Sequence, residues 1–387
     1  MKCEWREVKL QDIALELSDG LHKAPIFYPD GEYIFVNATN IENGRIVEKD
    51  PSKKTSLEEF LKYGVELTNR TILYSIDGTI GNIAKYRGEK CLLGKGACYI
   101  TLNDSVDVDY IYYLLQSPIF NEYIHIMSTG STIRHISLKT MRGFTFQLPP
   151  IMQQKTVGRV LSLLDDKIEL NNKINENLER QAEAIFDYYF FNIDSLPDGW
   201  SRGNLLDIAN FLNGLAMQKF RPQKNEAGLP VLKIKELRQG SCDTNSERCS
   251  SSIKPEYIVK DGDVIFSWSG SLLVNIWCGG ICGLNQHLFK VTSETYDKWF
   301  YYMWTAHHLD RFIAVAADKA TTMGHIKREE LAKAEVLIPS KEDYGNISAL
   351  MTPIFKLIII NRLEARKLAQ LRDELLPKLL SGEIDVS

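Results

Sequence analysis

The sequence predicts an α+β fold made by tandem duplication: a mixed α/β globule plus a long helix, given twice, with the two helices packed as an antiparallel coiled coil with pseudo-twofold symmetry. The first observation is a repeat. His135-Ile136 and the later Pro149 recur 190 residues on as His325-Ile326 and Pro339. The second is that each proline is followed by helical periodicity, whereas short β-branched and aromatic runs precede it. Repetition at this distance indicates duplication of a whole domain.

The predicted globules cover residues 1–149 and 193–340 and open with related phrases. Trp5 precedes Asp12-Ile13-Ala14, and Trp200 precedes Asp207-Ile208-Ala209. Runs such as Thr71-Ile72-Leu73-Tyr74 are bounded by turn residues and predict short strands. Helical stretches are expected around residues 110–124 and 299–313.

Residues 150–192 and 341–387 each predict a helix of about 36 residues, or about 54 Å at 1.5 Å per residue. Apolar or small residues alternate at spacings of four and three, which is the period of a coiled-coil seam. The first seam contains Val157, Leu161, Leu164, Ile168, Asn171, Asn175, Leu178, Ala182, Ile185 and Tyr189. The second contains Ile347, Met351, Ile354, Ile358, Asn361, Ala365, Leu368, Arg372, Leu375 and Leu379.

The short connection from Phe191 to Trp200 favours antiparallel pairing of the two helices. Asn171 and Asn361 lie near the middle of their helices, so we expect them to meet and to fix the register, because only aligned amides satisfy each other. Some apolar residues lie partly off the seams, and this surplus of apolar surface indicates a partner interface. They are Leu163, Ile174, Ile185, Phe186, Leu357, Ile359 and Leu376.

Composition favours a cytoplasmic protein that does not enter a membrane. Of 387 residues, 44% are hydrophobic and 25% charged, and the net charge is −4. The N-terminus lacks a secretory apolar region, and the apolar runs fall far short of the roughly 20 residues that span a bilayer. The seven cysteines have no framework spacing. We expect buried thiols rather than a metal site.

One window is locally basic despite the negative total. Residues 219–238 hold six basic and two acidic side chains, a net of +4. Such a patch is the electrostatic footprint of nucleic-acid binding, although a solvated charged face is the alternative. The candidate DNA-contacting residues in it are Lys219, Arg221, Lys233, Lys235 and Arg238.

The hydroxyl-rich segments before the two histidines are a second candidate, because hydroxyl groups contact phosphates and base edges. A capping or structural hydrogen bond is the alternative for the histidines. The segment 36–41 of the first globule is replaced by 232–237 in the second, so the two globules differ in their loops. The candidates outside the basic window are Lys23, Asn37, Asn40, Thr132, Arg134, His135, Thr321, Thr322 and His325.

The sequence contains no recognisable catalytic or nucleotide-binding motif. There is no glycine-rich nucleotide loop in a strand-to-helix context, no H-E-x-x-H and no G-x-S-x-G. Asp77-Gly78-Thr79-Ile80-Gly81 is a glycine-rich turn without a phosphate-binding lysine, and the second half has Ser269-Gly270-Ser271 instead. We therefore predict no catalytic residues, no metal and no cofactor in this chain.

The order of these features resembles the specificity subunit of Type I restriction-modification systems. Each half has a W…D-I-A opening, a loop leading to His-Ile, a proline-terminated strand and a long helix. The chain ends Leu375-Leu376-Pro377-Lys378-Leu379-Leu380-Ser381-Gly382-Glu383-Ile384-Asp385. The resemblance implies two target-recognition domains, at 1–149 and 193–340, and two spacer helices, at 150–192 and 341–387.

The resemblance also implies a function. Each globule would read one half of a bipartite, asymmetric site on double-stranded DNA, and the helices would dock two modification subunits that carry S-adenosylmethionine. Restriction subunits would join through the complex, and this chain would be non-catalytic. A stand-alone DNA-modifying enzyme and a structural scaffold without DNA contact are the alternatives.

Overall fold

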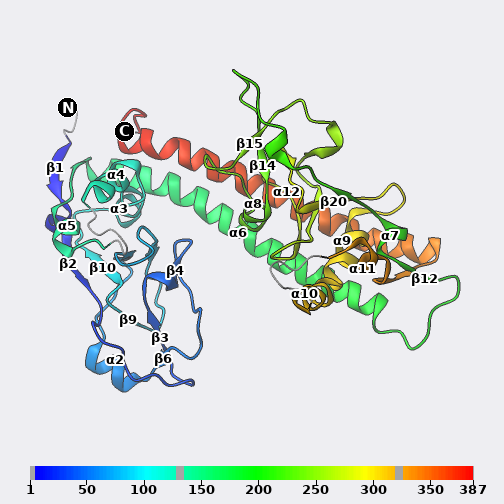
Figure 1. The fold of residues 1–387 in the computed structure, drawn as a ribbon. Helices are drawn as coiled ribbons and strands as arrows, with labels where there is room; N and C mark the ends of the chain where they lie inside the picture. The colour runs from blue at the N-terminus through cyan, green and yellow to red at the C-terminus, as the bar shows by residue number, and fades with distance from the viewer. Residues whose placement is uncertain (1–4, 128–134, 319–325, 387) are drawn as a thin grey trace. The chain divides into compact units, whose positions relative to one another are not determined.

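A computed structural model of the chain describes residues 5–127, 135–318 and 326–386 and contains two compact units (Figure 1). Unit 1 comprises Met1–Asp166 and Ala369–Ser387, and unit 2 comprises Lys167–Leu368. The long helices are α6, Ile151–Phe190, and α12, Lys341–Leu380, each of 40 residues. Each unit thus combines one globule with the near end of the helix that follows it and the far end of the other helix. The predicted boundaries at 149, 192 and 340 follow chain order and do not coincide with these units.

The globule of unit 1 holds most of its strands in a four-stranded sheet of order β2-β10-β7-β8 and a three-stranded sheet of order β6-β3-β9. Its strands are β1 Arg6–Lys9, β2 Ala14–Asp19, β3 Tyr33–Val36, β4 Ile41–Glu42, β5 Arg45–Ile46, β6 Lys54–Thr55, β7 Thr71–Ser75, β8 Ile83–Lys85, β9 Cys91–Leu93, β10 Ala97–Leu102 and β11 Thr145–Leu148. Its helices are α1 Leu10–Ile13, η1 Ala38–Asn40, α2 Leu57–Tyr63, α3 Val108–Leu114, α4 Pro118–Met127 and α5 Leu138–Gly143. The central strands β7 and β10 are buried throughout, which explains their β-branched and apolar composition.

Unit 2 repeats this arrangement with sheets of order β13-β20-β17-β18 and β15-β14-β19-β16. Its strands are β12 Ser201–Asn204, β13 Asn210–Asn213, β14 Leu229–Leu232, β15 Arg248–Cys249, β16 Ile258–Val259, β17 Val264–Ser267, β18 Leu273–Ile276, β19 Cys282–Leu284, β20 Leu288–Thr292 and β21 Glu335–Ile338. Its helices are α7 Leu205–Ile208, η2 Met217–Lys219, α8 Ile234–Gln239, η3 Pro255–Tyr257, α9 Lys298–His307, α10 Leu309–Asp318 and α11 Arg328–Ala332.

Each globule is closed by pairing of its first and last strands. In unit 1, β1 pairs antiparallel with β11, and Arg6 lies opposite Leu148. In unit 2, β12 pairs with β21, and Ser201 lies opposite Ile338. The strand that completes the globule therefore leads within a few residues into the long helix, which explains why a proline separates the two elements in both halves.

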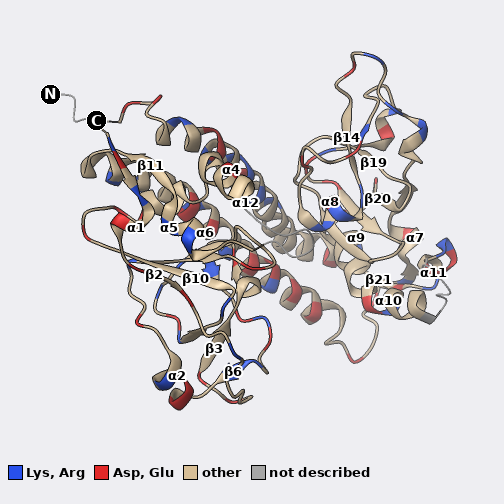
Figure 2. Ribbon diagram, turned by 60° about the vertical axis from the view of Figure 1, so that its left-hand side comes forward, with Lys and Arg blue, Asp and Glu red and all other residues tan. Residues whose placement is uncertain are grey.

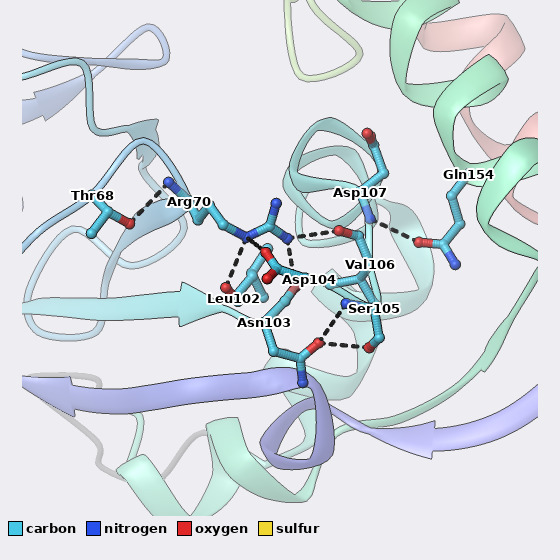
Figure 3. Close-up of polar contacts among 9 residues, drawn as sticks. All are labelled: Thr68, Arg70, Leu102, Asn103, Asp104, Ser105, Val106, Asp107 and Gln154. Carbon is cyan, nitrogen blue, oxygen red and sulfur yellow. Dashed lines mark hydrogen bonds and ion pairs between the residues drawn. The ribbon is translucent and has the colours of Figure 1, made fainter.

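The junction between the first globule and α6 is held by polar contacts (Figure 3). Arg70 donates hydrogen bonds to the carbonyl oxygens of Leu102, Asn103 and Val106 at 3.0, 2.5 and 2.8 Å. Gln154 of α6 accepts a 3.0 Å hydrogen bond from the amide of Asp107, the residue that caps α3. A Cβ at Gly158 would lie 2.5 Å from Asp107 Oδ1, so glycine lets α6 approach α3 closely.

The helix pair is antiparallel, as predicted. In unit 2 the later part of α6 packs on the earlier part of α12, with Ala182 and Phe186 in one core with Ile347 and Met351. In unit 1 the earlier part of α6 shares a core with the last turns of α12. Every predicted seam position is buried or half-buried, including the polar ones.

The expected pairing of Asn171 with Asn361 was wrong in detail. Asn361 donates to Asn175 Oδ1 at 2.9 Å, and Asn175 donates to the carbonyl oxygen of Ile358 at 3.2 Å. Asn171 donates instead to Glu364 Oε2 at 2.7 Å. The spacing along each helix correctly located a polar layer in the seam. The two helices are shifted relative to each other, so each asparagine bonds to a residue about one turn away from the expected partner.

The helices also carry ion pairs that hold each globule. In unit 2, Arg366 of α12 pairs with Asp261 at 2.7 Å, and Arg362 donates to Asn275 Oδ1 at 2.9 Å. In unit 1, Arg372 pairs with Asp165 at 2.7 Å, and Asp165 also accepts a hydrogen bond from Tyr113. Arg372 is thus a charged residue in the largely apolar seam, and it forms an ion pair there with an acidic residue of the opposite helix.

Candidate nucleic-acid interface

The segments that differ between the globules, 36–41 and 232–237, form equivalent capped turns. In unit 1 the amide of Asn37 donates to Asn40 Oδ1 at 3.1 Å, and Asn40 Nδ2 donates to the carbonyl oxygen of Val47 at 3.0 Å. In unit 2 the amide of Lys233 donates to Glu236 Oε2 at 3.2 Å. Asn40 is 9% exposed, with both ends of its amide engaged in the fold. Asn40 therefore holds the turn in place, and Asn37, which precedes the turn, is half-buried. Contact of either residue with DNA stays a prediction.

Basic residues of the counted window lie on α8 (Figure 2), and acidic side chains from later in the sequence pair with part of the window. Arg221 and Lys233 both pair with Glu247, at 3.0 and 2.7 Å. Lys235 pairs with Asp243 at 3.4 Å. These two acids follow the counted window in the sequence and reduce its net charge from +4 to +2. Lys233 and Arg221 lower the pKa of Glu247 by hydrogen bonding, which keeps that carboxyl charged.

Lys219 and Arg238 are the predicted contacts of this window that remain available. Both are exposed, and neither forms an ion pair within residues 135–318 or the other described parts of the chain. Arg238 borders a surface depression on α8 with Ile234, Lys235 and Gln239. Exposed cations without an acidic partner in the described parts of the chain are consistent with contacts to phosphate.

Residues far apart in the sequence of unit 1 meet beside the glycine-rich turn. His135 Nδ1 lies 2.8 Å from Asp77 Oδ1, and Lys95 Nζ lies 3.8 Å from Asp77 Oδ2. The side chains of His135, Asp77 and Lys95 are 41%, 30% and 51% exposed. His135 thus makes a structural hydrogen bond and still presents part of its ring to solvent, so both predicted roles are compatible with its position.

Lys23, another predicted contact, is engaged with an aromatic residue of α2. Lys23 donates a 2.8 Å hydrogen bond to the hydroxyl of Tyr63 and lies 4.5 Å from the centre of its ring. The candidates that lie outside the described residues are Thr132, Arg134, Thr321, Thr322 and His325.

The turn that follows β9 in unit 1 and β19 in unit 2 was not among the predicted DNA-contacting segments. The signal was Cys91-Leu92-Leu93-Gly94-Lys95-Gly96, which recurs as Cys282-Gly283-Leu284-Asn285-Gln286-His287. The offset is 191 residues, close to the offset of the histidine phrases. Neither turn matches a standard motif, so only comparison of the two halves could have drawn attention to it.

The described residues offer no metal-binding cluster of three or more histidine, cysteine or acidic side chains. Cys249, Cys278 and Cys282 are buried, and Cys242 is half-buried. Burial raises the pKa of Cys278 and of Cys249, which makes both thiols poor nucleophiles.

Comparison with known proteins decides the family. Residues 2–180 and 197–371 each match the domain described as Type I restriction modification DNA specificity domain. The chain belongs to the Type I restriction-modification DNA specificity family. The two matches confirm the tandem duplication, and the specificity subunit is the DNA-recognising, non-catalytic part of such a system, as the resemblance implied. A soluble protein agrees with this membership.

Curated relatives of the specificity family extend over nearly the whole chain. The specificity subunit of the Type I restriction enzyme MjaIX from Methanocaldococcus jannaschii is 27% identical, and the match covers 92% of this chain and 84% of that protein. The HindI specificity subunit from Haemophilus influenzae is 20% identical over 98% of this chain and all of that protein. The crystal structure of a Type-I restriction-modification S subunit from M. genitalium has the same fold, with a TM-score of 0.62, 14% identity and coverage of 100% and 97%.

Proposed function

We propose that each globule of this specificity subunit reads one half of a bipartite, asymmetric DNA target, and that the long helices dock two modification subunits. The observation that carries the proposal is the repetition of one backbone frame with different side chains. Asn37 in one globule is replaced by Lys233 in the other at the same capped turn. Equivalent positions with different hydrogen-bonding groups select different bases, so the two half-sequences differ.

Exposed apolar residues on the helices support the docking of two equivalent partners. Val160 of α6 and Leu350 of α12 are 36% and 47% exposed and lie at the same place in the repeat, 190 residues apart. Leu170 and Ile360 are 50% and 59% exposed and share the same relation. Apolar side chains at matched positions of two helices offer two similar surfaces, which suits two copies of one partner.

The predicted interface residues are partly revised by the structure. Leu163, Ile174 and Leu357 are exposed, as expected for a partner surface. Phe186 and Leu376 are buried in the cores of unit 2 and unit 1, because the globules cover more of the helices than the seam alone suggests.

The apolar composition of α12 is also typical of a membrane-spanning helix. Within the described part of the chain, α12 is the one helix long and apolar enough to cross a membrane. Only 28% of its most apolar stretch is buried. Because the same helix contributes to both globular cores, a protein partner accounts for the uncovered residues better than a lipid does.

The remaining features of the proposal follow from the role of a specificity subunit. The modification subunits would bring S-adenosylmethionine and the methyl-transfer chemistry, and restriction subunits would join through the complex. The target would be double-stranded DNA, and the location would be the cytoplasm. This chain would contribute recognition and geometry without a cofactor of its own.

The test is to express the chain with modification subunits encoded beside it, purify the complex and map the methylated sites. We expect one bipartite, asymmetric motif that disappears when this chain is omitted. A motif that is palindromic, or that persists without the chain, would refute the proposal. A variant in which both Leu170 and Ile360 are replaced by Glu should fold but fail to bind the modification subunits. That result would assign the docking of these subunits to the helices.

A further inference from the structure

The turn between β9 and β10 of unit 1 is held in place from three sides. The amide of Gly94 donates to the carbonyl oxygen of Val36 at 2.8 Å, and the amide of Lys95 donates to that of Leu21 at 3.0 Å. The turn closes through a 3.0 Å hydrogen bond from the amide of Ala97 to the carbonyl oxygen of Gly94. Lys95 and Gly96 are therefore the two central residues of a rigid turn.

Unit 2 builds the same frame from different residues. The amide of Asn285 donates to the carbonyl oxygen of Leu232 at 3.2 Å, and the amide of Leu288 closes the turn on Asn285 at 3.0 Å. Gln286 and His287 take the places of Lys95 and Gly96. Parallel bridges join Leu21 to Gly94 and Leu215 to Asn285, so each turn is also fixed to the segment that follows β2 in unit 1 or β13 in unit 2.

Only the central side chains of these turns are presented to solvent. Lys95 is exposed, whereas the other residues from 91 to 102 are all buried. A Cβ at Gly94 would lie 2.2 Å from Asn37 Oδ1, so a side chain at this position would require Asn37 to move. In unit 2, Gln286 and His287 are half-buried within an otherwise buried run from 282 to 289.

The polar groups around each turn are left partly unsatisfied. Among the described residues, the ammonium group of Lys95 has a single polar contact, at 3.8 Å from Asp77, and Asp77 also holds His135 at 2.8 Å. His287 Nδ1 is buried without a hydrogen-bond partner among the described residues, and Gln286 Nε2 lies 3.3 Å from His287 Nε2. Recognition of a base requires polar side chains that have free hydrogen-bonding groups and are held by a rigid backbone. Each turn provides one or two such side chains.

The chemistry of the two turns differs in a way that bases can distinguish. A lysine ammonium donates to O6 and N7 of guanine in the major groove, whereas a glutamine amide both donates to N7 and accepts from N6 of adenine. We propose that the two turns read bases, with Lys95 contacting a guanine in the half-site of unit 1 and Gln286 an adenine in the half-site of unit 2. This inference rests on the proposed function and names the residues that decide its specificity.

The test exchanges the side chains and leaves the frames in place. Complexes with the modification subunits would carry Lys95→Gln or Gln286→Lys, and their motifs would be mapped by methylation and by selection from a randomised duplex pool. We expect Lys95→Gln to lose the guanine preference at one position of its half-site and to weaken binding of the native site about 5- to 150-fold. Gln286→Lys should change one position of the other half-site only.

Two further variants control for charge and folding. Lys53→Gln removes an exposed lysine of unit 1 that pairs with Asp50, and it should leave the motif unchanged. Lys95→Arg keeps two donors that suit guanine, so it should retain the preference at that position. Assembly of each variant complex, measured by gel filtration, verifies folding.

The outcomes separate this inference from the proposed function. If the native complex is sequence-specific and both exchanges leave its motif unchanged, the turns do not read bases. Equal weakening of binding to all sequences would also overturn the inference, because it indicates a phosphate contact. If the native complex has no bipartite specificity, the proposed function itself fails.

Discussion

Replacement of Asn361 by alanine should destabilise unit 2 through the group that it leaves behind. Asn361 and Asn175 are 7% and 5% exposed, and the donor of Asn361 satisfies Asn175 Oδ1 at 2.9 Å. In Asn361→Ala this oxygen stays buried in the helix interface without its partner. An unsatisfied buried polar group costs about 1 to 3 kcal/mol, and we expect this loss in the free energy of unfolding.

The double replacement distinguishes this mechanism from a simple loss of contacts. In Asn175→Leu with Asn361→Leu, both amides are absent and no polar group remains unpaired. We therefore expect the double variant to be more stable than the sum of the single leucine variants predicts, by about 1 to 3 kcal/mol. Its cost would be weaker selection of the helix register, because the polar layer no longer penalises a shifted pairing.

Urea denaturation followed by tryptophan fluorescence measures this effect in the full chain. Five of the six tryptophans lie in unit 2, at positions 200, 268, 277, 299 and 304, so the signal reports mainly on that unit. Asn177→Ala is the control. Asn177 is exposed on α6, the helix that carries Asn175, and its replacement should change the free energy of unfolding by no more than about 0.5 kcal/mol. Additive single and double variants, or a single variant indistinguishable from the control, would contradict the reasoning.

Three further predictions concern other parts of the chain. The hydroxyl of Ser251 and nearby amides lower the pKa of Glu226 to about 2; its stabilising contribution should be present above the unfolded value of about 4.3 and disappear as pH falls through 2, which a carboxyl NMR titration would detect and which Glu226→Gln should abolish. Arg238→Ala should lower the salt dependence of DNA binding by about one unit, whereas Lys233→Ala should change it less because an acid already neutralises that lysine; equal slopes would remove Arg238 from the interface. Arg70→Met should speed hydrogen exchange across residues 102–107, because three carbonyl groups lose their donor, and unchanged exchange would show that the turn holds without it.

Features that depend on local spacing could be predicted from the amino-acid sequence. The 190-residue repeat identified two equivalent halves, and the alternation of four and three located both helix seams. Helical hydrogen bonds join residues four apart, so periodicity along the chain reports directly which face of α6 or α12 is buried. Antiparallel pairing followed from a short connection, because too few residues separate α6 from the second globule to allow another arrangement.

The side chains that meet across those elements could not be predicted without the folded structure. Asp77, Lys95 and His135 come together because neighbouring strands and a bridge align their ends, and their positions in the sequence carry no common spacing. Glu247 pairs with Arg221 and Lys233 because the fold brings these separate segments together. A relative shift of the two helices by about one turn makes Asn175 the hydrogen-bond partner of Asn361. Strand register and helix offset are set by the packing of whole units. The partners of a charge or an amide are therefore a property of the assembled fold, while the elements that carry them are written in the local sequence.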